Sequence, residues 1–157
     1  TDDRATAGAK VSSYVSSILA LRDARACGAQ EALFCRVEPR GRSIVEGATS
    51  NVLAVVDGRL RAPLAAGVLA GITRSTIVEC AKDLDLVVDE APIDVVDLMR
   101  ASELMVCSTI REVVPVVEVV DVEGRRRIGE GVVGGVFRAL RAALRVRIDA
   151  QIQAQSC

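Results

Sequence analysis

Apolar residues in the first half of the chain follow first a helical and then an extended pattern. From Val11 to Leu21 they recur at the spacing of one helical face, and Gly28 is a typical helix stop, so we predict a first helix here. Runs rich in β-branched and apolar residues then predict strands at residues 32–37, 43–45, 51–56 and 59–61. Between the last two runs, Asp57-Gly58 is typical of a hairpin turn.

In the second half of the chain, predicted helices and strands alternate. We predict helices over residues 73–81, 94–101 and 135–148, and strands over 86–88 and 104–107. The run VVPVVEVVDV, residues 113–122, has the β-branched density of one long strand, and Glu123-Gly124 should turn the chain after it. The expected fold class is therefore mixed α/β.

Composition narrows the possible functions. Half of the 157 residues are hydrophobic, which suffices for one domain with a buried core. Lys and Arg number 20 against 21 Asp and Glu, and aromatic residues make up 2%, so we expect no nucleic-acid surface. Every apolar stretch is interrupted well before ~18 residues, so we expect no membrane span.

Cysteine and histidine contents add further expectations. The five cysteines are irregularly spaced and lack a C-x-x-C pair, which is typical of free thiols in a reducing cytoplasm. The chain has no histidine, which removes Ser-His and Cys-His triads and His-containing metal sites. We therefore expect a cytoplasmic protein without a metal site.

Four segments carry candidate chemistry, in the order AKVSSY, VEGATSN, GVLAGITR and CSTIREVVPV. Together, from Lys10 to Asp121, they resemble the signature of class IV (fold-type IV) pyridoxal-phosphate aminotransferases, a family that includes branched-chain and D-amino-acid aminotransferases and aminodeoxychorismate lyases. The resemblance implies the family's large domain at residues 10–149, folded as a mixed-sheet pseudo-barrel with flanking helices. It also implies a linker remnant at 1–9, a C-terminal tail at 150–157, a missing small N-terminal domain, and a homodimer.

In this family a lysine holds pyridoxal 5′-phosphate covalently, and the resemblance gives that role to Lys10, with Tyr14 close by. A primary amine is needed to hold the cofactor and to move a proton at the substrate. The alternative for Lys10 is a solvated side chain at a helix entrance. The other lysine of the chain, Lys82, lies outside all four motifs.

The resemblance pairs Glu46 with the pyridine nitrogen of the cofactor, where a carboxylate keeps that nitrogen protonated and the ring an electron acceptor. It places Ser50 and Asn51 around the same cofactor. Two structural alternatives stay open, because Glu46 could simply end a strand before a glycine turn and Asn51 could be only a turn residue.

Gly71, Ile72 and Thr73 lie where a loop becomes a helix. Free backbone N–H groups and the helix dipole favour phosphate at such a place. The resemblance makes Ile72 and Thr73 the phosphate-binding pair and places Leu69 against the cofactor ring. The alternative is an ordinary helix cap that uses the Thr73 hydroxyl.

In the fourth segment the resemblance implies a second phosphate-binding hydroxyl at Thr109. Ser108, Ile110 and Arg111 would then line the loop near cofactor and substrate. Arg111 is a candidate ligand for a substrate carboxylate, although an arginine at a loop–strand junction is more often part of a surface ion pair.

The resemblance implies transfer of an amino group between an amino acid and a 2-oxo acid, of branched-chain or D-amino-acid type. The alternatives are 4-amino-4-deoxychorismate lyase, which uses the same cofactor for elimination, and a non-catalytic domain fragment. From the residues alone, Thr1 is a candidate N-terminal nucleophile of a hydrolase. TDDRATAG is, however, typical of a linker rather than of the buried strand that such a nucleophile needs.

Overall fold

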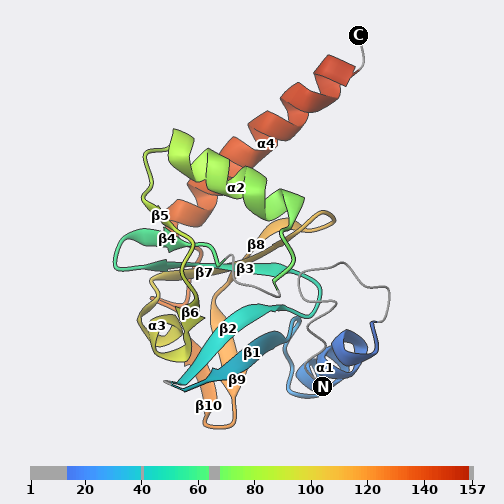
Figure 1. The fold of residues 1–157 in the computed structure, drawn as a ribbon, viewed down its shortest axis with the longest axis vertical. Helices are drawn as coiled ribbons and strands as arrows, with labels where there is room; N and C mark the ends of the chain where they lie inside the picture. Colours follow the sequence, from blue (N-terminus) through green and yellow to red (C-terminus); the bar gives the residue numbers. More distant parts are fainter. Residues whose placement is uncertain (1–13, 40, 64–67, 156–157) are drawn as a thin grey trace.

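The structure is a computed structural model that describes residues 14–39, 41–63 and 68–155. Its elements alternate between helix and strand, so the mixed α/β class expected from the sequence is confirmed. In chain order (Figure 1) they are α1 (Val15–Ala26), β1 (Leu33–Glu38), β2 (Gly41–Gly47), β3 (Asn51–Val56), β4 (Arg59–Arg61), α2 (Ile72–Asp83), β5 (Val88–Asp89), β6 (Ile93–Asp94), α3 (Val95–Arg100), β7 (Glu103–Ser108), β8 (Glu112–Val116), β9 (Glu118–Asp121), β10 (Gly124–Arg127) and α4 (Gly135–Gln155).

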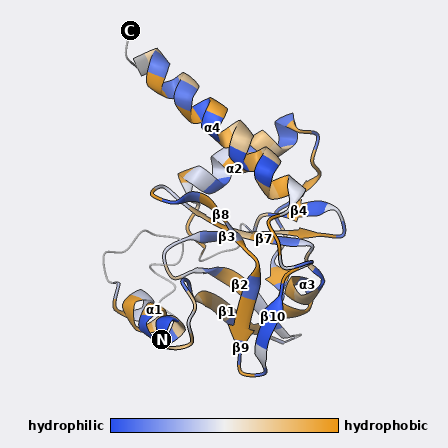
Figure 2. Cartoon of the chain, turned by 180° about the vertical axis from the view of Figure 1, so that it is seen from behind, coloured by the Kyte–Doolittle hydropathy of each residue, from blue (hydrophilic) through white to orange (hydrophobic). Residues whose placement is uncertain are grey.

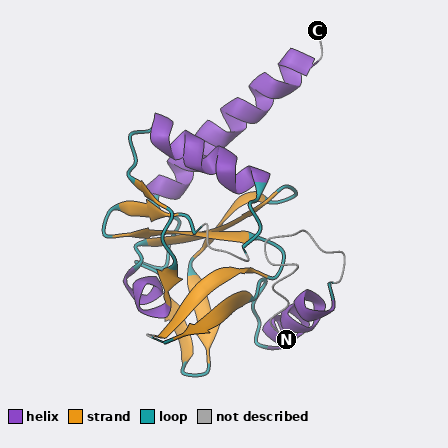
Figure 3. Cartoon of the chain, viewed as in Figure 1, coloured by secondary structure: helices purple, strands orange, loops and turns teal. Residues whose placement is uncertain are grey.

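A five-stranded sheet in the order β5-β4-β3-β7-β8 lies at the centre, antiparallel except for the β4–β5 pair. All six residues of β3 are buried, because both faces of this sheet are covered. Leu53 and Val55 belong to a core beneath α2 and α4, whereas Val52 and Ala54 belong to a second core shared with β2 and α3. Figure 3 shows the helices α2 and α4 on one side of the sheet and the β1-β2-β6 sheet on the other.

The β3–β4 hairpin confirms the sequence prediction for residues 51–61. Its turn residues Asp57 and Gly58 have φ values of 50° and 74°. Left-handed backbone at both central positions is the geometry that a two-residue hairpin turn requires, which is why Asp-Gly is favoured there. The continuous apolar run of β3, without alternation, is typical of a strand covered on both faces.

The prediction of one long strand over residues 113–122 was wrong. Its first half is β8, which pairs with β7, and its second half is β9, which pairs with β10 in a separate two-stranded sheet. Val117 lies between the two halves and belongs to neither strand. Figure 2 shows β9 as hydrophobic and β10 as hydrophilic, so the arginine-rich β10 offered no apolar run to predict it.

The described strands form three sheets, none of which closes on itself, so the pseudo-barrel stays a prediction. Within the described ranges, no helix is both long and apolar enough to cross a bilayer. Because β3 and β7 are antiparallel, the start of β3 lies beside the end of β7, with Asn51 opposite Cys107. Four of the residues predicted to bind a cofactor lie here: Ser50 and Asn51 where β3 begins, and Ser108 and Thr109 where β7 ends.

Candidate active site

The backbone of Leu69 connects three of the predicted site residues. Its N–H faces the Glu46 carboxylate and lowers the pKa of that carboxyl. Its carbonyl accepts two hydrogen bonds, from Asn51 Nδ2 at 2.9 Å and from the Gly71 N–H at 2.8 Å. Residues from β2, from β3 and from the loop before α2 thereby meet at the Leu69 backbone, and we call them the Leu69 unit (Glu46, Asn51, Leu69 and Gly71).

Gly71 is the residue that allows this close approach. A Cβ atom at this position would lie 2.0 Å from Asn51 Oδ1 and 3.2 Å from Asn51 Cγ. Side chains do not approach one another so closely, so any larger residue would push Asn51 away from Leu69. Asn51 is only 8% exposed and has little room to move.

Helix α2 begins directly after Gly71, and no side chain caps it. Its N-cap is Gly71, without a side-chain hydrogen bond, and the first turn contains no acidic residue. The interpretation of Thr73 as an ordinary cap was therefore wrong, because Thr73 lies inside the helix. The first N–H groups of α2, with the positive end of its dipole, are the kind of site where an anion such as phosphate binds. Ile72, at this end, is 83% exposed.

Glu46 is half-buried in β2 and has no ion pair with the described residues. Burial raises the pKa of its carboxyl above the ordinary value, and the hydrogen bond from the Leu69 backbone opposes the rise. A partly buried carboxylate is stabilised by a cationic partner. Glu46 therefore has the chemistry expected of a residue that receives a protonated ring nitrogen.

A second group of contacts joins the β2–β3 turn to the β7–β8 loop through Glu31, which precedes β1. The Glu31 carboxylate accepts hydrogen bonds from Ser50 Oγ at 3.0 Å, from Thr49 Oγ1 at 3.2 Å and from the guanidinium of Arg111. The backbone N–H of Arg111 in turn donates to Ser108 Oγ at 3.3 Å. Of the predicted residues, Ser50, Ser108 and Arg111 are thus brought together. Glu31 lies outside the four segments that carry candidate chemistry in the sequence.

Thr109 and Ile110 form the exposed tip of the same β7–β8 loop, and Ile110 is 94% exposed. Neighbouring Cys107 is only 1% exposed, and burial raises the pKa of its thiol to about 12. Its side chain belongs to the core beneath α2, so the end of β7 is firmly anchored just before the loop begins.

Arg74 supports the other side of the site and was also not singled out from the sequence. It is 2% exposed in the first turns of α2. Its guanidinium donates to the carbonyls of Pro63, at 3.0 Å, and Ala62, and it forms an ion pair with Glu90 at 2.9 Å. Since a buried arginine must be paired, these contacts fix the start of α2 relative to the end of β4.

Comparison with known proteins identifies the family. A family model described as "Amino-transferase class IV" matches residues 1–119. The chain belongs to this family.

Among class IV aminotransferases, the D-alanine aminotransferase of Staphylococcus haemolyticus is 36% identical over 116 residues, which are 73% of this chain and 40% of that protein. The branched-chain-amino-acid aminotransferase of Escherichia coli K12 is 34% identical over 139 residues, 88% of this chain and 43% of that protein. The chain therefore spans less than half the length of these relatives.

The fold of this chain matches part of two solved branched-chain amino acid aminotransferases. The branched-chain amino acid aminotransferase of Thermobaculum terrenum, in its PLP-form, matches with a TM-score of 0.72 at 33% identity, over 84% of this chain and 41% of that one. The enzyme from Thermoproteus uzoniensis with norvaline matches with a TM-score of 0.73 at 31% identity, over 88% of this chain and 44% of that one.

Lys10 and Tyr14 are the remaining residues that the class IV resemblance assigns. Lys10 lies outside the described residues, as do Thr1 and the segment 1–9 that was predicted to be a linker. Tyr14 is 44% exposed at the start of α1, a helix without buried residues. Its backbone carbonyl accepts a hydrogen bond from the Ile18 N–H at 2.8 Å, within the helix itself.

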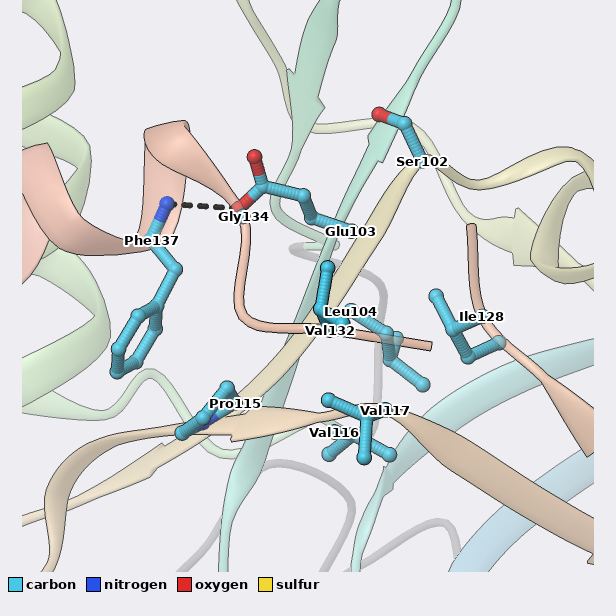
Figure 4. A pocket seen from close by; sticks show the side chains of 10 residues that line it. All are labelled: Ser102, Glu103, Leu104, Pro115, Val116, Val117, Ile128, Val132, Gly134 and Phe137. Carbon is cyan, nitrogen blue, oxygen red and sulfur yellow. Dashed lines mark hydrogen bonds between the residues drawn. The ribbon is translucent and has the colours of Figure 1, made fainter. Parts of the chain in front are cut away.

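Two cavities in the described part of the chain are lined by none of the residues that the class IV resemblance assigns. The smaller, of about 10 Å³, has room for about one water and lies beside Glu103, Phe137 and Gly134 (Figure 4). Here the Glu103 carboxylate accepts hydrogen bonds from the N–H groups of Val136 at 2.9 Å and Phe137 at 2.7 Å, so it caps α4. An open groove along α4 is lined by Pro115, Val133, Phe137, Arg138, Arg141, Ala142 and Arg145. Among the described residues, no group of His, Cys, Asp or Glu is arranged to hold a metal ion.

Proposed function

We propose that this chain is the cofactor-binding large domain of a pyridoxal-phosphate-dependent aminotransferase. The enzyme transfers an amino group between an amino acid and a 2-oxo acid, of branched-chain or D-amino-acid type. The names of the relatives support this reaction class. The single observation that carries the proposal is the Leu69 unit, which sets a half-buried carboxylate beside an uncapped helix N-terminus.

The two ends of this unit fit the two charged ends of the cofactor. Glu46 would accept a hydrogen bond from the protonated pyridine nitrogen, and the N–H groups of Ile72 and Thr73 would bind the phosphate. Leu69, between them, lies against the ring. Ser50, Asn51, Ser108 and Thr109 complete the surroundings, with Thr109 as a second hydroxyl for the phosphate.

When bound, pyridoxal phosphate supplies an electron sink that allows the substrate Cα to lose a proton. Lys10 would hold the cofactor covalently and carry that proton, and the resemblance gives Tyr14 a place beside the cofactor. Glu46 keeps the pyridine nitrogen charged during the reaction. Ile110 contacts the substrate from the loop tip.

We further propose the arrangement of the whole enzyme. The large domain comprises residues 10–149, with a linker at 1–9 and a tail at 150–157, into which α4 continues as far as Gln155. A small N-terminal domain covers the site and completes it, and the large domain is a pseudo-barrel with flanking helices. The enzyme is a cytoplasmic homodimer.

Chemical labelling of the two lysines tests the cofactor assignment. Borohydride makes a covalent link between pyridoxal phosphate and a lysine amine permanent, and peptide mass mapping then locates it. We expect the label on Lys10. Lys82, exposed in the last turn of α2, is the internal control, and a Lys82→Arg variant should be labelled to the same extent as the natural chain.

The labelling should be repeated in the protein that includes the small domain, because half of a site binds cofactor weakly. A label on Lys82 alone, or none in that complete protein, would refute the assignment.

A further inference from the structure

Glu31 is the most densely bonded carboxylate near the proposed site. Its Oε1 accepts the Ala32 N–H at 3.1 Å, while its Oε2 accepts Ser50 Oγ, Thr49 Oγ1 and the Arg111 guanidinium. Arg111 Nη2 also donates to Thr49 Oγ1 at 2.9 Å. The partners come from 18, 19 and 80 residues away along the chain.

Burial and charge make these contacts strong. The Glu31 side chain is 10% exposed and that of Arg111 33% exposed, so the ion pair is shielded from much of the solvent. Burial by itself raises the pKa of the Glu31 carboxyl, but hydrogen bonds from Arg111, Ala32 and Ser50, with the charge of Arg111, lower it below its ordinary value. Glu31 is therefore ionised and paired at neutral pH.

Gly47 leaves the space in which this pair reaches the β2–β3 turn. A Cβ at Gly47 would lie 2.2 Å from Ser50 Oγ and 3.3 Å from Glu31 Cδ. The turn is thus shaped to bring the hydroxyls of Thr49 and Ser50 onto the Glu31 carboxylate, directly before Asn51 enters β3.

We propose that Glu31 and Arg111 form a clamp that positions the cofactor-binding turns. The clamp ties the turn at residues 48–50, next to Asn51 of the Leu69 unit, to the loop at residues 108–111, which carries Ser108 and Thr109. This inference rests on the proposed function, because it assigns both segments to the pyridoxal-phosphate site. Both residues are positioning residues, since neither is required to touch the cofactor.

The clamp also changes the role expected of Arg111. Its guanidinium is occupied by Glu31 and Thr49, and its backbone N–H is bonded to Ser108. To bind Arg111, a substrate carboxylate would have to displace these contacts, and the negative charge of the adjacent Glu31 would repel it. Arg111 therefore orders the loop, and the substrate carboxylate is bound by another group.

The test uses the complete enzyme with three variants: Glu31→Gln, Arg111→Met and the double variant. The matched control is Asp57→Asn, which breaks the exposed ion pair of 2.8 Å between Asp57 in the β3–β4 turn and Arg100 at the end of α3. Hydrogen exchange of segments 47–51 and 108–112 is measured in the cofactor-free protein, and the dissociation constant of pyridoxal phosphate is measured by absorbance.

Each single variant should speed exchange in both segments and weaken cofactor binding about tenfold, with no further loss in the double variant, since both remove the same interaction. The KM for the amino acid should stay unchanged. In Asp57→Asn the exchange rates, the cofactor dissociation constant and the KM should all equal those of the natural enzyme. Unchanged exchange in residues 108–112 of Glu31→Gln would overturn the clamp. A raised amino-acid KM in Arg111→Met but not in Glu31→Gln would instead make Arg111 a substrate ligand.

The two proposals fail separately. A natural enzyme that binds no pyridoxal phosphate would refute the proposed function. The exchange rates of the cofactor-free variants would still decide whether Glu31 holds the two segments together.

Discussion

Replacement of Gly71 by alanine perturbs the closest contact of the Leu69 unit. The new methyl group would lie 2.0 Å from Asn51 Oδ1, so the Asn51 side chain must move and its 2.9 Å hydrogen bond to the Leu69 carbonyl is lost. An unpaired buried amide costs about 1–3 kcal/mol, and an off-rotamer side chain about 0.5–1.5 kcal/mol. Alanine also lowers the conformational entropy of the unfolded chain, and this offsets about 0.4–1 kcal/mol of the loss.

The expected net loss is about 2 kcal/mol of unfolding free energy, or roughly 4–8 °C in Tm for a domain of this size. Denaturant unfolding of the chain measures it directly. Gly135→Ala is the matched control, because no atom lies within 4 Å of a Cβ at that position, and it should be neutral or slightly stabilising.

A double variant makes the reasoning specific to this contact. In an Asn51→Ala background the clash is absent, so Gly71→Ala should cost almost nothing there. If Gly71→Ala cost the same with and without Asn51, or cost nothing in the natural chain, the close approach described for the Leu69 unit would be wrong.

Three further predictions concern other parts of the chain. Glu46→Gln should slow transamination while cofactor stays bound. It should also stabilise the cofactor-free protein at pH 7 but not near pH 3. Burial raises the pKa of the Glu46 carboxyl in the folded state, so at pH 7 its ionisation favours the unfolded state, whereas near pH 3 the carboxyl is protonated in both states. An unchanged rate would remove Glu46 from the site. The isolated chain should be almost inactive, since pockets form preferentially between domains, and robust turnover by a pure sample would contradict this. Glu103→Ala should lower unfolding free energy by about 1–3 kcal/mol through loss of the α4 cap, and an unshifted denaturation midpoint would show that the cap is dispensable.

Local pattern was sufficient for the elements that bury apolar residues. β3 and the turn at Asp57 and Gly58 could be predicted from residue types. A strand covered on both faces requires a continuous apolar run, and a left-handed turn favours Asp-Gly. The two-residue β6 is too short for any periodicity, and β10 is polar. The break at Val117 was missed because a change of partner strand leaves β-branched residues on both sides of it.

Some residues of the candidate site could likewise be predicted from the sequence, and others could not. Glu46, Asn51 and Gly71 could be proposed because they fall in short segments that resemble those of a known family. Glu31 could not, because it lies outside these segments and its partner Arg111 is 80 residues away. Arg74 ends the third segment, but its role depends on the carbonyls of Pro63 and Ala62, 11 and 12 residues away, which the local pattern does not reveal. Only the folded chain brings such charges to their partners.

The position of Cys107 opposite Asn51 gives the protein an internal reporter of motion at the site. Its thiol is buried and weakly acidic, so an alkylating reagent can reach it only when the end of β7 separates from its surroundings. Cys27 and Cys35 are exposed and react without such opening, whereas the buried Cys80 samples the middle of α2. The alkylation rate of Cys107 relative to that of Cys80 would therefore measure how often the site opens independently of the rest of the core.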